Sequence, residues 1–247
     1  MRDLFDPSPP VLNPSELVRT FTKRSASDLR LPSRAIVTFH ANDAKALLKD
    51  RQNSLVEAWR PFRTIHRFDG SETVVTRSYF GGPNMAALIE ELSAFGVREF
   101  CMFGYAGGIM PGLAVGDLIV ATGASREDGV SGHYLPGDEA IVRSAWTDEW
   151  AAETGAYFRV GPVWSTDAIY RETVDKVVRF RQAGFLGVEM ETASLYAVCR
   201  AKDLRGVAFL VVSDLLSDKG WKPGFHSPAF KAGVKRLTRF FQERVIV

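Results

Sequence analysis

Three carboxylates of this 247-residue chain stand in apolar surroundings, where charged side chains are rarely found. Glu189 and Glu191 lie two residues apart in the largely apolar stretch 187–195, and Asp214 follows the apolar run 207–212. A buried carboxylate is usually paired or functional, because burying an isolated charge is costly. In a pocket it accepts hydrogen bonds from sugar hydroxyls or, when burial raises its pKa, donates a proton near neutral pH. The two stretches together predict one site.

Each carboxylate also has a purely structural interpretation. Residues two apart share a face in a strand but not in a helix, so a change from strand to helix here would direct only one glutamate into a pocket. The other glutamate would then be a favourable charge at a helix N-terminus. Asp214 is equally suited to cap a helix that begins at Leu215. The residue types alone leave both interpretations open.

The elements that must position these residues alternate between strands and helices. Strands are expected at 34–39, 72–79, 98–103, 115–122, 157–160, 163–165 and 207–212. Helices are expected at 14–19, 44–48, 84–95, 139–154, 172–183, 192–202 and from 229 onward. This alternation predicts an α/β protein with a largely parallel core sheet. Sites in such sheets gather at the carboxyl ends of the strands, where both carboxylate stretches are expected to lie.

The glycine-rich segment 104–112 follows the expected strand 98–103 and is a third candidate at that edge. Its glycines would let backbone N–H groups approach a ligand closely, although a tight crossover turn explains them as well. The segment matches neither the G-x-G-x-x-G dinucleotide pattern nor the phosphate-binding loop G-x-x-x-x-G-K-[ST]. We therefore predict that the protein uses no nicotinamide or other organic cofactor.

The composition is that of an ordinary globular protein, with 31 basic and 29 acidic residues and a formal net charge of +2. This balance does not suggest a nucleic-acid partner. No run approaches the ~20 apolar residues of a membrane span, and the first residues lack a signal-peptide core. We expect a cytoplasmic protein with no membrane association. Its two cysteines are expected to be buried free thiols, and no metal site is predicted.

Two segments divide the chain. Residues 1–33 are rich in Pro and Ser and are interpreted as an arm that lies over the body or over a neighbouring subunit; a partly disordered tail is the alternative. Residues 34–247 show no repeat or linker and are expected to form a single domain. The arm and Trp59, which is expected to be exposed, weakly support a homo-oligomer.

Taken together, these motifs resemble the nucleoside phosphorylase superfamily, which includes purine nucleoside phosphorylases, uridine phosphorylases and methylthioadenosine nucleosidases. The most specific matches are 188–191, before an expected helix, and 212–214; weaker ones are 103–108, 115–117 and the Gly82-Pro83 pair. The resemblance covers most of the chain from about residue 34. It implies a three-layer αβα phosphorylase/hydrolase-like fold with a mixed central sheet, a nucleoside substrate and homo-oligomerisation.

The resemblance also implies roles for individual residues. Glu191 would hold the ribose 2′- and 3′-hydroxyls, Met190 would pack against the sugar, and Glu189 would have a lesser role there. Asp214 would be the catalytic acid that protonates N7 of a purine as the glycosidic bond breaks, and the Ser-Asp pair resembles that of purine-type members. The remaining residues expected near the base are Ala106, Gly107, Ile169, Tyr170 and Ser213.

The match fails where family members bind phosphate. Phe39 stands at the usual glycine position, Asp43 and Met102 stand at arginine positions, and Tyr105 retains only a hydroxyl. Two further residues are candidates for this phosphate or water site, although each could simply be a solvated surface side chain. They are Arg60 and His40.

Three hypotheses follow from a site that matches the family at the sugar and the base but not at the phosphate. The first is phosphorolysis of a purine nucleoside, with inorganic phosphate as co-substrate and base and ribose 1-phosphate as products. The second is hydrolysis by water, which the missing phosphate ligands favour. The third is a non-catalytic nucleoside-binding descendant, against which the retention of both Glu191 and Asp214 argues.

Overall fold

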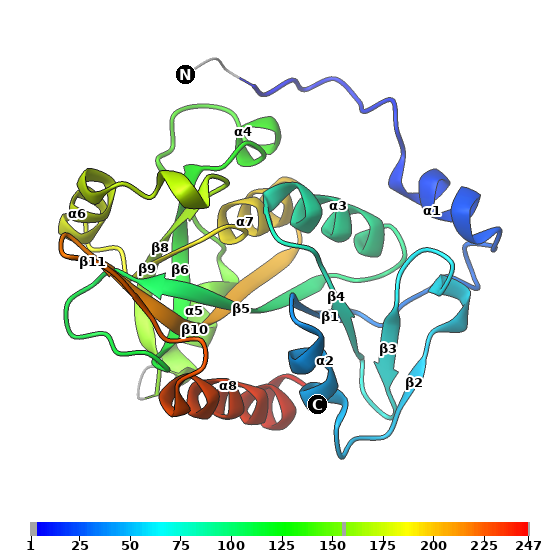
Figure 1. Cartoon of the computed structure of the whole chain (residues 1–247). Coiled ribbons are helices and arrows are strands. Elements are labelled where there is room, and N and C mark those ends of the chain that lie inside the picture. The colour runs from blue at the N-terminus through cyan, green and yellow to red at the C-terminus, as the bar shows by residue number, and fades with distance from the viewer. Residues whose placement is uncertain (1–3, 155–156, 247) are drawn as a thin grey trace.

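Parallel pairing between strands that are distant in sequence builds the centre of the protein (Figure 1). The computed structural model describes residues 4–154 and 157–246. The sheet contains β1 (Arg34–Thr38), β2 (Asn53–Leu55), β3 (Ile65–Phe68), β4 (Thr73–Arg77), β5 (Glu99–Gly108), β6 (Leu118–Glu127), β7 (Ile141–Val142), β8 (Arg159–Thr166), β9 (Gly187–Glu189), β10 (Arg205–Ser217) and β11 (Gly220–Pro223). The helices are α1 (Pro14–Thr22), α2 (Ala41–Leu48), α3 (Gly82–Ser93), α4 (Ser131–Tyr134), α5 (Trp146–Thr154), α6 (Val174–Gln182), α7 (Thr192–Ala201) and α8 (Pro228–Phe240), with shorter turns η1 (Glu57–Trp59), η2 (Ile169–Arg171) and η3 (Phe241–Val245).

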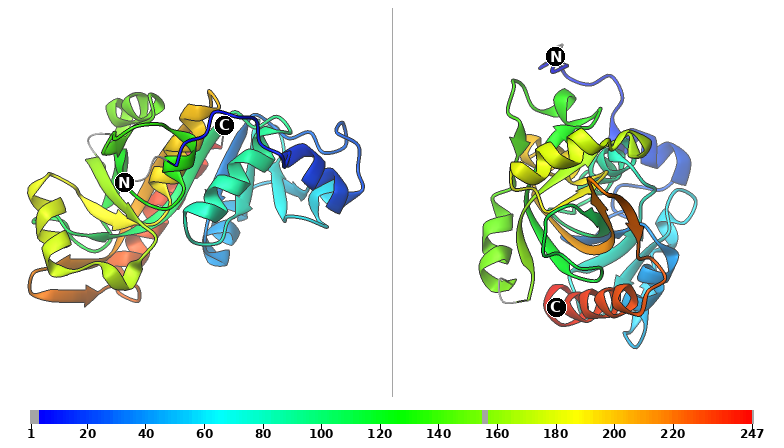
Figure 2. Two further views of the ribbon diagram at one scale, coloured as in Figure 1. Left: turned by 90° about the horizontal axis from the view of Figure 1, so that it is seen from above. Right: turned by 60° about the vertical axis from the view of Figure 1, so that its left-hand side comes forward.

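Helices cover both faces of the sheet. Apolar side chains of α1, α3 and α7 pack on one face, and those of α2, α5 and α8 pack on the other. Figures 1 and 2 show α8 running along the side opposite α3 and α7. The predicted α/β class with a mixed central sheet is confirmed. None of the helices in the described ranges combines the length and the apolar composition needed to cross a bilayer.

Part of the sheet closes into a ring. The strand order runs β10-β6-β8-β9-β5, and β5 pairs again with β10. Of these pairs, β6–β8, β8–β9 and β5–β10 are parallel, whereas β10–β6 and β5–β9 are antiparallel. Four strands continue outward from β5 in the order β1-β4-β3-β2, while β11 pairs with β10 and β7 with β6. Closure of the sheet was not predicted from the sequence.

The ring and the outer strands separate along β5 and form a fork. β1 pairs with β5 up to Phe103, and β9 begins to pair with it at Gly107. Between these points, residues 104–106 have β10 as their strand partner on one side and, within the described part of the chain, none on the other. The carboxyl end of β1 and the β9–α7 junction therefore lie on the same side of β5, at either end of this unpaired stretch.

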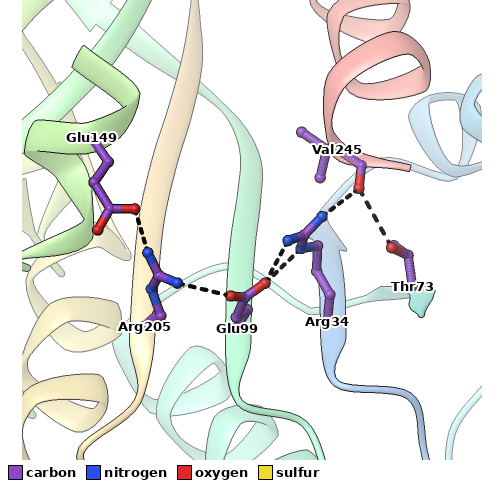
Figure 3. A network of polar contacts seen from close by, with 6 residues as sticks. All are labelled: Arg34, Thr73, Glu99, Glu149, Arg205 and Val245. Atoms are coloured by element: carbon purple, nitrogen blue, oxygen red, sulfur yellow. Dashed lines mark hydrogen bonds and ion pairs between the residues drawn. The ribbon is translucent and has the colours of Figure 1, made fainter. Parts of the chain in front are cut away.

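Ion pairs stabilise the end of the sheet where β1, β5 and β10 begin, which is opposite to their carboxyl ends (Figure 3). Arg34 and Arg205, at the starts of β1 and β10, both bind Glu99 at the start of β5, with N–O distances of 2.8 and 3.2 Å. Arg34 also donates to the Val245 carbonyl. The two arginines neutralise a half-buried carboxylate and hold three parallel strands in register. The carboxyl ends of these strands lie at the other end of the sheet, where a site is expected.

Several elements differ from the prediction. The expected strands 157–160 and 163–165 are one strand, β8, and the helix expected over 139–154 begins only at Trp146, after the short strand β7. The small strands β2, β3, β9 and β11 were not predicted, because they consist of only three or four residues each. The helix expected at 14–19 is α1, which buries Val18 against α3 and anchors this part of the arm. The first three residues of the arm lie outside the described residues.

Two predictions about single side chains were also tested. Cys101 and Cys199 are buried free thiols, as expected. The expectation that Trp59 is exposed was wrong, because its ring is fully buried and its indole N–H donates to the Leu29 carbonyl. Trp59 thus holds the segment that follows α1 against the body.

Candidate active site

The sugar end of the predicted site lies at the β9–α7 junction, where Glu191 is 5% exposed. Its Oε1 accepts a hydrogen bond from the backbone N–H of Gly81, which immediately precedes α3. Gly81 has a φ of +96°, a backbone conformation that favours glycine. Burial raises the pKa of Glu191, and the charge of Glu189 raises it further. A donor from the N-terminus of a helix stabilises such a carboxylate.

Glu189 has a different environment from Glu191. One of its oxygens accepts from Ser165, and the other accepts from the N–H groups of Glu191 and Thr192, at 2.9 and 2.8 Å. Ser165 in turn accepts from the N–H of Ala193. Both oxygens of Glu189 therefore hold the first turn of α7, which is the helix-terminal role that the sequence left open.

The base end lies on β10, where the chain contains a bulge. Val212 pairs with Ala106 of β5, but the next residue of β5, Gly107, pairs with Asp214, so Ser213 is the additional residue. Bulges re-aim side chains near active sites. Asp214 consequently lies on a strand that continues to Ser217, and the alternative that it caps a helix at Leu215 was wrong.

Two donors hold the carboxylate of Asp214, which is 8% exposed. Ser213 Oγ donates to Oδ1 at 2.6 Å, and Trp221 Nε1 donates to Oδ2 at 2.7 Å. Trp221 belongs to β11, which forms a hairpin with the end of β10. A Cβ atom at Gly107 would lie 3.3 Å from Asp214 Oδ2, so the glycine allows the acid to approach β5 closely. Trp221 was not recognised in the sequence, although the turn before Gly220 was a signal for a hairpin.

A second carboxyl near Asp214 was also missed. Burial and the negative charge of Asp214 raise the pKa of Glu172 to about 7. Glu172 follows η2, which carries two residues predicted to contact the base. Ile169 and Tyr170 are both exposed there, 53% and 97% respectively, so neither side chain contributes to the core. Ala106 and Gly107 are buried on β5, and Met190 is half-buried between the two glutamates.

The expected phosphate corner holds a buried carboxyl instead of an arginine. Asp43, in the first turn of α2, is 3% exposed, and both its oxygens accept from the hydroxyl of Tyr105, at 2.8 and 2.7 Å. Burial raises the pKa of Asp43, while the hydrogen bond from Tyr105 and the neighbouring His40 oppose that rise. The carboxyl and the phenol thus satisfy each other.

Aromatic contacts connect this corner to the sugar end. The His40 ring stacks on Tyr105, with centroids 4.7 Å apart, and contacts the edge of Phe80. Phe80 stacks on Phe39 and directly precedes Gly81, the donor to Glu191. The structure therefore brings His40 and Tyr105 together near the sugar end.

The structure does not bring Arg60 into this group of residues. Its side chain is 70% exposed and forms a surface ion pair, 3.6 Å long, with Glu57. Met102 is buried beneath this corner. If Gly104 carried a Cβ atom, that atom would contact the Met102 side chain.

An arginine that the sequence did not reveal lies beside the corner. Arg77, at the end of β4, donates to the Phe39 carbonyl at 3.4 Å. It also lines a cavity of about 380 Å³ between α2 and the β3–β4 hairpin, together with Lys45 and with Arg63, whose guanidinium group pairs with Glu91. Within residues 4–154 and 157–246, no three His, Cys, Asp or Glu side chains are grouped so as to hold a metal ion.

Comparisons with known proteins identify the family of this chain. Residues 33–244 match the Phosphorylase superfamily. The chain is 31% identical over 178 residues to guanosine phosphorylase from Halorubrum lacusprofundi, covering 69% of each protein. It is 33% identical over 189 residues to uridine phosphorylase from Escherichia coli, covering 68% of this chain and 74% of that one. The fold resembles that of uridine phosphorylase from Vibrio fischeri, with a TM-score of 0.73, 20% identity and coverage of 87% and 92% of the two chains. With nearly the whole chain matched in sequence and in fold, this protein belongs to the nucleoside phosphorylase superfamily.

Proposed function

We propose that this protein is an enzyme that cleaves the N-glycosidic bond of a purine nucleoside by phosphorolysis, releasing the base and ribose 1-phosphate. The observation that carries the proposal is the position of Gly107 between two strands that bear buried carboxyls. Gly107 pairs with Asp214 on one side and with β9, which leads to Glu191, on the other. Two interstrand spacings, from Asp214 to Val188, amount to roughly 10 Å, and Glu191 follows Val188 shortly along the chain; a nucleoside can span such a distance.

The two carboxyls suit the two ends of a nucleoside. The ribose hydroxyls would donate to Glu191, which Gly81 holds in place. At the other end, Asp214 would give its proton to N7 as the C1′–N9 bond breaks and the base leaves with the bonding electron pair. Cleavage of such bonds passes through an oxocarbenium-like sugar, so protonation of the leaving group is a large part of the catalysis.

Glu172 supports a purine as the base. A 6-oxopurine presents an acceptor at N7 and a donor at N1–H, on different edges of the ring. Asp214 would serve the first, and an ionised Glu172, close enough to Asp214 for their charges to interact, would accept from the second. The relatives act on both base classes according to their names, so the support for a purine comes from these two carboxyls.

Arg77 supports phosphate as the nucleophile. Its contact with Phe39 places a guanidinium group beside the turn between β1 and α2, and Lys45 lines the same cavity. Guanidinium groups bind phosphate oxygens well, because two parallel hydrogen bonds match the geometry of the anion. The phosphorylases among the relatives point in the same direction.

Asp43 favours hydrolysis as a second candidate function. An ionised Asp43 would repel a phosphate dianion, whereas the same carboxylate could accept a proton from a water molecule that attacks the sugar. Its bond from Tyr105 and its proximity to His40 keep it in one orientation.

One assay separates these reactions. Purified protein would be incubated with guanosine, inosine and uridine, with and without inorganic phosphate, and the free base and the sugar product would be measured. Phosphorolysis predicts that release of the base requires phosphate and yields ribose 1-phosphate. Release at an unchanged rate without phosphate, with free ribose as the product, would establish hydrolysis. Binding without turnover across the panel would favour a non-catalytic descendant.

We also propose that the protein is a cytoplasmic homo-oligomer. Two apolar side chains on the loop before α3, Tyr79 and Phe80, are 73% and 57% exposed. They lie beside the aromatic cluster that contains His40, and burying them against another subunit would favour association. Sedimentation equilibrium would test this; a monomer at micromolar concentration would contradict it.

A further inference from the structure

We propose that Trp221 is a positioning residue for Asp214: its indole N–H holds one carboxylate oxygen, so that the transferable proton resides on the other. The inference rests on the proposed function, because it takes Asp214 as the acid that protonates the leaving base. Its basis is the 2.7 Å bond from Trp221 Nε1 to Asp214 Oδ2.

The donors and acceptors around Asp214 favour one place for the proton. An indole N–H donates and never accepts, and the carbonyl oxygen of a neutral carboxyl is a better acceptor than its hydroxyl, so the contact with Trp221 favours Oδ2 as the oxygen without hydrogen. Oδ1 lies 2.6 Å from Ser213 Oγ, and that hydroxyl lies 3.2 Å from the Ala106 carbonyl. When Asp214 is protonated, Oδ1 donates to Ser213, which donates to Ala106. When Asp214 is ionised, Ser213 rotates its hydrogen to Oδ1, so both protonation states are satisfied.

This arrangement favours the proton transfer itself. As the C1′–N9 bond breaks, the electron pair moves onto the base. The Oδ1 hydrogen turns from Ser213 to N7 and is transferred, the Ser213 hydrogen rotates to Oδ1, and Asp214 becomes negatively charged. Hydrogen bonds to an ionised acceptor are roughly twice as strong as neutral ones. The bond from Trp221 therefore strengthens as the reaction proceeds, and interactions that strengthen in the transition state accelerate a reaction.

The hairpin holds Trp221 without making its ring part of the core. Trp221 pairs with Leu216 across the hairpin, and Ser217 pairs with Gly220 at the turn. Arg181 of α6 binds Asp218 in that turn at 3.1 Å. Trp221 as a whole is 62% exposed, so core packing does not explain the presence of the largest side chain at this position.

The test compares two leaving groups. Trp221→Phe keeps an aromatic ring but removes the N–H donor. Guanosine needs a proton to release its base, whereas 7-methylguanosine carries a fixed positive charge on the base and releases it without one. Asp214→Asn serves as the reference for loss of the acid. Lys222→Ala, on the same hairpin with an exposed side chain, controls for general disturbance of β11.

We expect Trp221→Phe to lower kcat/KM for guanosine roughly ten- to hundredfold and to leave 7-methylguanosine within about twofold of wild type, as for loss of a hydrogen bond to a charged group. Lys222→Ala should match the wild type on both substrates. The role of Trp221 would be overturned if Trp221→Phe lost activity equally on both substrates, or on neither, while Asp214→Asn lost activity on guanosine alone. Absence of turnover by the wild type on every nucleoside would overturn the proposed function and this inference with it.

Discussion

The hydroxyl of Tyr105 donates to both carboxylate oxygens of Asp43, at 2.8 and 2.7 Å. This bond joins the middle of β5 to the first turn of α2, across the fork where β1 has ended and β9 has not begun. It gives a buried carboxyl its donor at the corner where the nucleophile is expected. The contact therefore affects stability as well as chemistry.

Removing this donor should destabilise the fold. Tyr105→Phe leaves Asp43 buried without its hydroxyl partner, and the unfolding free energy near pH 8 should fall by about 1–3 kcal/mol. Urea denaturation measures this, with the exposed Tyr157→Phe as control. The loss should shrink at low pH, where Asp43 is neutral and costs less to bury. An unchanged midpoint at pH 8 would show that the bond contributes little.

The two buried glutamates should respond differently to the same substitution. Glu191→Gln keeps an oxygen for Gly81 but loses acceptor capacity toward a sugar, so kcat/KM should fall roughly tenfold or more with little change in stability. Glu189→Gln should instead lower the unfolding free energy by about 1–3 kcal/mol, because an amide offers one acceptor where the carboxylate uses two.

Steady-state kinetics and urea titrations of both variants form one experiment. The reverse pattern, with the activity loss at Glu189 and the stability loss at Glu191, would contradict the assignment.

Gly107 should tolerate no side chain. A Cβ atom there would overlap a methyl of Leu216 and lie 3.3 Å from both Asp214 Oδ2 and Val188 Cγ1. Gly107→Ala should therefore displace the hairpin and the acid and lower kcat roughly a hundredfold, the scale expected for misplacement by about 1 Å. Adding Leu216→Ala removes the closest contact and should restore part of the activity. A fully active single variant would show that the close approach is unimportant.

Glu172 should make stability depend on pH in a predictable direction. Its pKa is raised from 4.5 to about 7, so between these values the folded protein binds a proton that the unfolded chain has lost. The contribution of this group to stability is therefore complete below about pH 4.5 and is lost as pH rises through about 7.

Glu172→Gln should consequently reduce the fall in unfolding free energy between pH 5 and pH 8. Urea titrations at both values measure the difference, with the exposed Glu72→Gln as the matched control. An identical fall in the wild type and in Glu172→Gln would show that folding does not raise the pKa of Glu172.

The parts of the site that the sequence revealed depend on local pattern. Glu191 and Asp214 stand out because charges in apolar runs are conspicuous, and the alternation of strands and helices placed both near one edge of a sheet. The same pattern could not assign Glu189, because a helix-terminal role and a binding role require the same residue at the same spacing. Only the contacts with Ser165 and Thr192 distinguish them.

The features that were not predicted depend on tertiary contacts, which leave no local pattern in the sequence. The bulge at Ser213 follows from how β10 pairs with β5, and the proximity of Glu172 to Asp214 follows from how η2 packs. Trp59 was expected at the surface, yet its indole N–H donates to Leu29 in the segment after α1, and its side chain is fully buried. Closure of the ring required β9, a strand of three residues that is too short to recognise by periodicity.

The fork along β5 gives each corner of the site a separate origin in the chain. The base corner belongs to β10 and β11, the sugar corner to the β9–α7 junction, and the remaining corner to the turn between β1 and α2. Because β1 leaves β5 before β9 joins it, residues of that turn can change without altering the register that places Glu191 and Asp214. In such an architecture the attacking group can be exchanged during evolution, or by design, as a separate module while the apparatus for sugar and base is inherited intact.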